Sequence, residues 1–277
     1  MNLTREEVNM MNKIQLDIFK HFVDICRELN LTYYMVHGSL LGALRLADFI
    51  PYDDDIDVAM PRRDYEILMQ NGPKLLPKYL FLQSYKTDSE YPLAFAKIRN
   101  SNTTFSQTIM RKLEINEGIY IDIFPIDNYP NTFLQQKWYS IKEKFYGIRI
   151  SSRLFYKDKQ PFWKKIIREV VQYIYPSWKQ AVEARANLYT HLQNTDVVIT
   201  VGGKPSERGI SKKIFGTPLQ LKFSDFNINC PEKTSKYLEC IYGDYSNYNP
   251  MGKYINEDGT VRVSAEKFST TKSFLSK

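Results

Sequence analysis

Four aspartates crowd into one short stretch of this chain, where IPYDDDIDVAMPRRDY contains Asp53, Asp54, Asp55 and Asp57. The apolar residues that follow predict a strand, in which alternate side chains share a face. Asp55 and Asp57 are therefore expected to project together, with Asp53 on the same face if the strand begins that early and Asp54 on the other. Carboxylates ~4 Å apart repel by roughly 4 kcal/mol per pair at a dielectric constant near 20, so we expect a cation among them.

An EF-hand calcium loop also uses alternating aspartates, but this sequence excludes it. Counted from Asp53, the sixth position is Val58, where the loop needs glycine, and the twelfth is Asp64 instead of glutamate. A solvated acidic loop that caps a helix beginning near Arg62 remains the alternative interpretation.

Two other segments predict partners for these aspartates. LTYYMVHG followed by SLLGALRL predicts a strand, a turn at Gly38 and a helix whose N-terminus at Ser39 offers N–H groups to an anion. Asp122 lies in the apolar strand EGIYIDIFPID, where the alternative is a strand-end carboxylate satisfied by backbone. A glycine–serine turn with three carboxylates predicts a site that binds Mg²⁺, or Mn²⁺ in its place, and aligns a nucleotide phosphate for displacement.

Several cationic side chains could contact the phosphates of a donor. Lys97 and Arg99 in FAKIRN would share one face of a strand, although a pair of solvated surface cations explains the spacing nearly as well. Arg45, at the end of the predicted turn helix, is a further candidate. His37 precedes the glycine and is expected to hydrogen-bond backbone in preference to orienting a phosphate.

The elements that must position these residues predict an α+β fold, with a nucleotidyltransferase-like mixed sheet flanked by helices. A capping box at Thr4 and Glu7 opens an amphipathic helix that closes near Asn30. The remaining predicted elements are a helix at RRDYEILMQNGPKLL that breaks near Asn71, Gly72 and Pro73, strands at YLFLQSY, LAFAKIRN, VVITVGG and LQLKFSDFNINC, and a helix at EKTSKYLECIYG.

Three regions follow from this pattern. Residues 1–130 are expected to form the catalytic core, and residues 194–277 to complete it with strands and a helix. Residues 131–193 are predicted to form a helical insertion that is basic, rich in aromatic residues and interrupted at Pro161 and Pro176. We expect this insertion to serve as a membrane-binding or acceptor-binding subdomain.

Composition and charge limit the class of protein. The 277 residues are 43% hydrophobic and 25% charged, as in globular proteins, and the three cysteines and three histidines argue against a disulfide framework and a zinc site. No apolar run suggests a membrane span or a secretory signal, so a cytoplasmic protein is expected. The net charge of +7 comes from Lys137–Arg185, a segment that contains twelve basic and four acidic residues. This basic segment predicts either contact with an anionic inner membrane surface or a solvated helical face, and nucleic acid is not expected because no known binding module accompanies it.

The order of the motifs HGSLLGALR, FIPYDDDIDVAMPRRDYE, FAKIRNSNTT, YIDIFPID and YLECIYGDY resembles the LicD family of phosphocholine transferases, which is similar to the fukutin group. The resemblance implies metal-dependent transfer of phosphocholine from CDP-choline to a hydroxyl of a glycan or a lipid-linked glycan. It also implies that Asp55 and Asp57 are the metal-binding pair, preceded by the carboxylate of Asp53, and that Asp122 is the third acidic position. We expect Asp122 to complete the site and to accept the proton of the hydroxyl.

The chain departs from the family pattern at two places. Leu46, Ala47 and Asp48 replace a usual basic residue and glycine after Arg45, and Ser39 replaces a threonine while keeping its hydroxyl. Because the aspartates match the family pattern and the loop after Arg45 does not, the resemblance supports the type of reaction more strongly than the identity of the donor and acceptor.

The alternatives left open are transfer of ribitol phosphate, glycerol phosphate or phosphoethanolamine from CDP carriers, true nucleotidyl transfer from a nucleoside triphosphate, and a non-catalytic glycan- or membrane-binding relative. A choline donor would require aromatic faces. The candidates near the motifs are Tyr52, Tyr120, Phe124, Tyr242 and Tyr245.

Overall fold

A mixed sheet forms the centre of the protein in the computed structural model, which describes residues 1–51, 53–154, 162–174, 177–246 and 260–271. The strands β3 and β7 are parallel, whereas the other pairings of this sheet are antiparallel. In spatial order the strands are β2 (Tyr34–Met35), β3 (Asp57–Pro61), β7 (Ile119–Asn128), β5 (Ala96–Asn100) and β4 (Leu80–Gln83), with β8 (Val197–Thr200) beside the end of β7 and β9 (Ile210–Ser211) beside β8. The predicted α+β class is confirmed.

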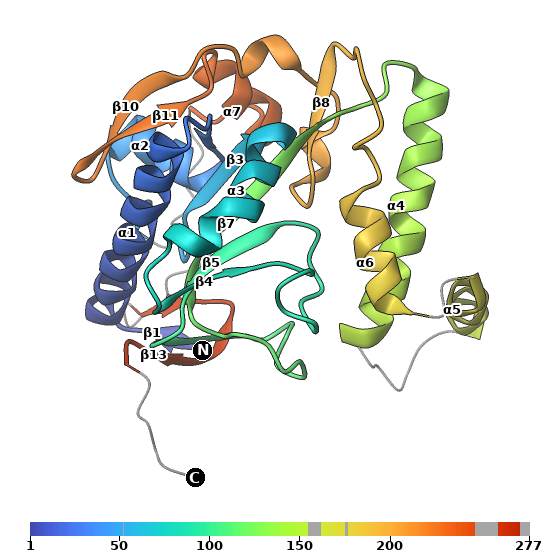
Figure 1. Cartoon of the computed structure of the whole chain (residues 1–277), viewed down its shortest axis with the longest axis horizontal. Helices are drawn as coiled ribbons and strands as arrows, with labels where there is room; N and C mark the ends of the chain where they lie inside the picture. Colours follow the sequence, from blue (N-terminus) through green and yellow to red (C-terminus); the bar gives the residue numbers. More distant parts are fainter. Residues whose placement is uncertain (52, 155–161, 175–176, 247–259, 272–277) are drawn as a thin grey trace.

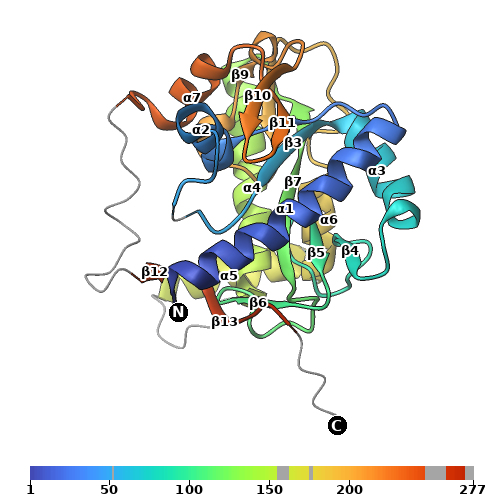
Figure 2. The same cartoon turned by 90° about the vertical axis from the view of Figure 1, so that its left-hand side faces the viewer.

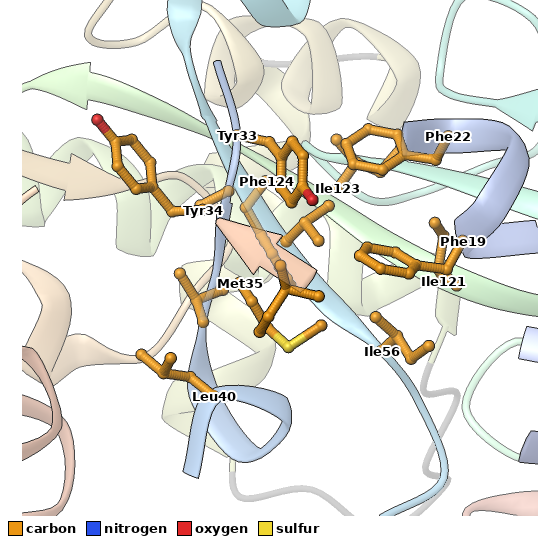
Figure 3. Close-up of a cluster of buried hydrophobic side chains, with 14 of the residues drawn as sticks. Phe19, Phe22, Tyr33, Tyr34, Met35, Leu40, Ile56, Ile121, Ile123 and Phe124 are labelled. Atoms are coloured by element: carbon orange, nitrogen blue, oxygen red, sulfur yellow. The ribbon is translucent and has the colours of Figure 1, made fainter. Parts of the chain in front are cut away.

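The helix α1 (Arg5–Glu28) crosses the sheet and supplies much of the main core. Its predicted capping box is present, because the Thr4 hydroxyl accepts the Glu7 N–H and the Glu7 carboxylate accepts the Thr4 N–H. Figure 3 shows Phe19 and Phe22 of α1 beside Ile121 and Ile123 of β7, and all four side chains are buried. This apolar contact holds β7, the strand that carries Asp122, against the longest helix of the core.

Smaller elements surround the central sheet, and Figure 2 shows several of them beside α1. Three two-stranded pairings are β1 (Asn2–Leu3) with β12 (Val261–Arg262), β6 (Thr104–Gln107) with β13 (Ala265–Ser269), and β10 (Leu219–Phe223) with β11 (Phe226–Cys230). Further helices are α2 (His37–Leu46), α3 (Arg62–Leu75) and α7 (Thr234–Tyr242), and the 3₁₀ turns are η1 (Pro205–Glu207) and η2 (Lys212–Ile214).

A helical layer lies on the opposite side of the sheet from α1, at the right of Figure 1. It comprises α4 (Phe133–Leu154), α5 (Phe162–Ile174) and α6 (Trp178–Ala186). A second apolar cluster joins α4 and α6 to the end of β7 and to β8, through residues such as Tyr146, Tyr189 and Ile199. Pro161 and Pro176, the predicted interruptions of this region, lie outside the described residues.

Two predicted boundaries are wrong. The helix α3 does not break near Asn71 but continues through Pro73 to Leu75. Pro73 lies in the last turn, so its missing N–H affects only the end of the helix, and the Leu76 N–H still donates to the Gly72 carbonyl at 3.0 Å. The strand expected across LTYYMVHG is limited to β2, because α2 already begins at His37.

None of the described helices is long and apolar enough to cross a lipid bilayer.

Candidate active site

Three aspartates meet where β3 begins beside the middle of β7. The parallel register places Asp57 opposite Asp122, and Asp55 lies two residues before Asp57, just outside the strand. Oxygen atoms of these three carboxylates lie within 4.8 Å of one another. Parallel pairing puts directly opposed side chains on the same face, so the register itself brings together carboxylates from distant parts of the sequence. Carboxylate oxygens are the ligands that Mg²⁺ prefers.

Asp55 and Asp57 project together as predicted, but the segment before β3 is not an extended strand, and the predicted position of Asp54 on the other face is wrong. The Asp53 N–H donates to the Ile50 carbonyl at 3.0 Å in a turn, and regular pairing begins only at Asp57. Asp54 does not face away: its carboxylate lies within 4.8 Å of those of Asp53 and Asp55, and it accepts the Ser264 hydroxyl at 3.0 Å.

Asp53 offers an oxygen that would suit a cation. Its Oδ2 atom is buried and accepts no hydrogen bond from the residues that the structure describes. A Cβ atom added to Gly38 would lie 2.3 Å from this oxygen, so glycine is needed there for close approach. The left-handed backbone belongs instead to His37, with φ of 52°, which corrects the prediction that Gly38 makes the turn.

Ser39 organises the acidic segment through its hydroxyl. Its Oγ atom accepts the Asp57 N–H at 3.0 Å and lies 3.5 Å from the Asp55 carbonyl oxygen. Because these bonds use the backbone of the aspartates, they fix the carboxylates without consuming their oxygens. The first turn of α2 therefore contacts the acidic segment directly.

His37 lies between two carboxylates and not against backbone, so the predicted contact was wrong. Its Nδ1 atom is 3.2 Å from Asp57 Oδ2, and its Nε2 atom is 2.6 Å from Glu207 Oε1. Burial would lower the pKa of His37, but Glu207 and Asp57 outweigh burial and raise this pKa to about 10. A protonated His37 donates to both carboxylates and holds Asp57 toward the cluster.

Glu207 is a residue of this site that the sequence motifs did not reveal. It is fully buried in η1, and its Oε2 atom has no hydrogen-bond partner in the described part of the chain. Its Oε1 atom accepts the Lys204 N–H at 2.6 Å. A Cβ atom on Gly203 would approach Glu207 Oε2 to 2.6 Å, so the glycine pair Gly202 and Gly203 ahead of an acidic residue was the available signal.

Lys97 is buried and directly paired with Asp122, which excludes the surface interpretation of this lysine. The two residues are opposed across β5 and β7, and the Lys97 ammonium donates to Asp122 Oδ1 while lying 3.5 Å from the centre of the Tyr120 ring. The same contact corrects the alternative for Asp122, which is not a strand-end carboxylate satisfied by backbone. Lys97 therefore places a positive charge at the edge of the three carboxylates.

Arg99 is also buried, but protein acceptors occupy its guanidinium. It donates to the Gly118 carbonyl at 2.6 Å and to the side chain of Gln83. This residue braces β5 against β4 and the start of β7 and lies two residues from Lys97 on the same strand.

Crowding changes the acid–base properties of the carboxylates. Burial, followed by the charge of Asp57, raises the pKa of Asp53 to about 8, and burial with the same neighbour raises the pKa of Asp55 well above its ordinary value. Burial also raises the pKa of Asp122 to about 6, although Lys97 opposes this change. A bound cation would relieve this repulsion, so the donor set fits a divalent metal ion.

Arg45 lies on the surface near the end of α7 and contacts the chain there. It donates to the carbonyl groups of Tyr245 and Ser246 and lies 5.8 Å from the Tyr245 ring centre. The loop that departs from the family pattern turns at Ala47, which has a φ of 51° and caps α2. Arg45 thus differs from Lys97, which bonds a carboxylate of the cluster.

The aromatic candidates for a choline site divide into two groups. Tyr120 lies under Lys97, and the Phe124 ring meets the His37 ring edge-on at 5.2 Å between centres. Tyr242 lies under Lys204, and Tyr245 under Arg45, beside α7. Tyr52 lies outside the described residues.

Comparisons with known proteins are consistent with this geometry. Residues 30–153 match the family model described as LicD/FKTN/FKRP, nucleotidyltransferase domain, a range that holds all five aspartates discussed above. The chain is 23% identical over 244 residues to the lipopolysaccharide cholinephosphotransferase LicD of Haemophilus influenzae, which covers 85% of this chain and 89% of that protein. It is 31% identical over 121 residues to an uncharacterised protein of Rickettsia prowazekii, covering 43% of this chain and 41% of that protein.

Proposed function

Because the predicted resemblance to the LicD family, a family of transferases, is confirmed over residues 30–153, we propose that this protein moves phosphocholine from CDP-choline to a hydroxyl of a cell-surface glycan or glycolipid precursor. The observation that carries the proposal is the meeting of Asp55, Asp57 and Asp122 inside the matched region. The name of the Haemophilus relative supports choline phosphate as the transferred group.

The residues of the site suggest a role for each group in the transfer. Asp55, Asp57 and Asp122, with Asp53 beside them, would hold Mg²⁺ or Mn²⁺, which would neutralise the donor diphosphate. Ser39 and His37 hold Asp57 in place from its two sides. The acceptor oxygen would form a bond to the phosphorus that carries choline as the bond to CMP breaks, and Asp122, with its raised pKa, would take the hydroxyl proton.

The direct test is release of CMP by the purified protein with CDP-choline, Mg²⁺ and candidate glycans. Asp57→Asn removes a metal ligand, so kcat/KM should fall about 10³-fold, equivalent to a loss of several kcal/mol of charge stabilisation. Asp225→Asn makes the same chemical change at an exposed turn and should leave the rate unchanged. Wild-type activity in Asp57→Asn, or full activity in excess EDTA, would remove the metal assignment.

The transferred group is identified by a panel of donors. CDP-choline is compared with CDP-ribitol, CDP-glycerol and CDP-ethanolamine, and the true donor with Mg²⁺ should raise the melting temperature most. Pyrophosphate release from a nucleoside triphosphate would identify a nucleotidyltransferase instead. Failure of every donor, with no metal binding by calorimetry, would support the non-catalytic alternative.

A further inference from the structure

The outward face of α4 is apolar where a solvated helix would be polar. The exposed side chains include Leu134 at 79%, Trp138 at 57%, Ile141 at 45% and Ile148 at 36%. Their spacing of four, three and seven residues places them in one stripe along the helix. We call this the α4 stripe.

The opposite face of α4 already has its partners in the protein. Tyr146 and Ile150 belong to the second apolar cluster with α6, and the buried Glu143 forms an ion pair with Arg208. The helix is therefore anchored through its inner face. These contacts fix the rotation of α4 about its axis. Within the described residues, the α4 stripe therefore faces solvent.

The helix α5, which contacts α4, carries exposed apolar side chains of its own. Ile166, Val170, Tyr173 and Ile174 are exposed on α5, with Tyr173 at 88%, whereas Val171 is buried. Figure 1 shows α5 beside the lower end of α4, and the two helices contact each other. An exposed surface of this kind over two adjacent helices indicates an interaction site more often than chance exposure.

Cationic side chains accompany the α4 stripe. Lys137 lies 4.5 Å from the Phe133 ring centre and Lys142 lies 5.4 Å from the Trp138 ring centre, and Lys144 is exposed nearby. In the described part of the chain, none of these three lysines forms an ion pair. Their charges are available to an external anionic surface.

We propose that the α4 stripe, together with the exposed apolar side chains of α5, docks on a bilayer that contains anionic lipid. The aliphatic side chains would enter the boundary between headgroups and acyl chains, Trp138 would lie at headgroup depth, and the lysines would contact lipid phosphates. A second copy of the chain fits less well, because Lys137, Lys142 and Lys144 accompany the α4 stripe and two such faces repel. Docking goes beyond the proposed transfer reaction and does not require it.

The test is flotation of the full-length protein with vesicles, without substrate. The protein should float with equal amounts of phosphatidylcholine and phosphatidylglycerol at low salt, and not with phosphatidylcholine alone. The double variant Leu134→Ser with Ile141→Ser should weaken binding at least about tenfold, and Lys137→Gln with Lys144→Gln should weaken it about tenfold or more. The matched control Lys213→Gln changes an exposed lysine on η2 and should bind like the wild type.

Three results would overturn the proposal. These are failure to float with anionic vesicles at low salt, binding that the α4 stripe variants leave unchanged, and a dimer in solution that the same variants dissociate, which would assign the face to self-association. Circular dichroism should show intact folding, since all the substituted side chains are exposed. CMP release with a soluble acceptor should be unchanged in these variants, so failure of docking and failure of the proposed transfer are distinguishable.

Discussion

The acidic cluster is held by buried charges of the opposite sign from two sides. His37 contacts Asp57 and Glu207, while Lys97 contacts Asp122. A buried charge is costly unless it is paired, and here each cation is paired with a carboxylate that we propose as a metal ligand. His37 and Lys97 therefore fix the positions of the carboxylates and also affect their pKa values.

We expect Mg²⁺ to stabilise the protein more at pH 8 than at pH 6. The pKa of Asp53 is raised to about 8 and that of Asp122 to about 6, so the folded state favours their protonated forms. Their contribution to stability is complete below the ordinary pKa of 3.8 and is lost as the pH rises through the raised values. His37, raised from 6.5 to about 10, loses its contribution in the same direction. The melting temperature in EDTA should therefore fall between pH 6 and pH 8, and Mg²⁺ should oppose this fall because it binds the ionised carboxylates.

Scanning fluorimetry with and without Mg²⁺ measures this difference. Asp53→Asn should reduce the pH dependence in EDTA, because it removes one of the shifted groups. A melting temperature that rises from pH 6 to pH 8 in EDTA would contradict the expectation.

Glu207→Gln should lower kcat/KM about 10–100-fold while the protein remains folded. The amide keeps an oxygen for His37 and for the Lys204 N–H but removes the charge that keeps His37 protonated and oriented toward Asp57. Activity assays beside Glu239→Gln, which changes an exposed residue of α7, would measure the effect. Equal rates in the two variants would show that Glu207 has no positioning role.

At the residue scale, the sequence predicted which aspartates lie together but not which buried side chains contact them. Asp55, Asp57 and Asp122 stand out because each is an acidic residue next to an apolar strand sequence. Glu207 does not, since a single acid in a glycine-rich turn resembles any solvated loop until tertiary structure buries it. The same limit explains why the sequence left Lys97 open between a phosphate contact and a solvated surface position and did not reveal its buried contact to Asp122.

At the scale of elements, one ion pair links the end of β7 to the start of α3. Arg62 donates twice to Asp127, with both distances 2.7 Å, and also to the Ala186 carbonyl at 3.2 Å at the end of α6. The pair is bidentate and Asp127 is buried, so Arg62 joins sheet, core helix and helical layer at one point.

Arg62→Ala should lower the free energy of unfolding by about 3–5 kcal/mol, because it leaves the buried Asp127 carboxylate without its counter-charge. Arg63→Ala removes the adjacent but exposed arginine and should change stability by less than about 0.5 kcal/mol. Urea denaturation of both variants provides the comparison. Similar midpoints for the two would show that the Arg62 pair contributes little.

Element boundaries were the part of the fold that sequence patterns predicted least well. The amphipathic period of α1 and its capping box specify that helix almost completely. The acidic segment before β3 has strand-like spacing, but the Asp53 N–H closes a turn with Ile50 and the Ser39 hydroxyl takes the Asp57 N–H. These tertiary contacts shape the segment, so Asp55 and Asp57 lie together as predicted but Asp54 does not lie on the opposite face.

At the scale of the whole molecule, one apolar core connects distant parts of the chain. Cys26 of α1 and Cys230 of β11 belong to this same core, whereas Cys240 on α7 is exposed. The α+β class was predictable because apolar periods distinguish helices from strands along the chain. The sheet order was not, because it depends on which strands meet after long connections.

A thiol reagent such as DTNB should react quickly with one cysteine of the folded protein and with three after denaturation. Burial raises the pKa of Cys230 to about 12 and that of Cys26 still further, so both thiols remain protonated and inaccessible. Since both lie in one core, they should become reactive together as urea is increased. Separate exposure of Cys26 and Cys230 would show that the core unfolds in parts.

Pairing of β3 with β7 is also a condition for forming the site during folding, because this pairing places Asp57 opposite Asp122. The elements α3, β4, β5 and β6 lie between β3 and β7 in the sequence, so bringing Asp57 beside Asp122 closes a long loop. A hairpin such as β10 and β11 needs no such closure and can form early. If Mg²⁺ binds at these carboxylates as proposed, its binding during refolding would report the moment at which β3 and β7 have paired.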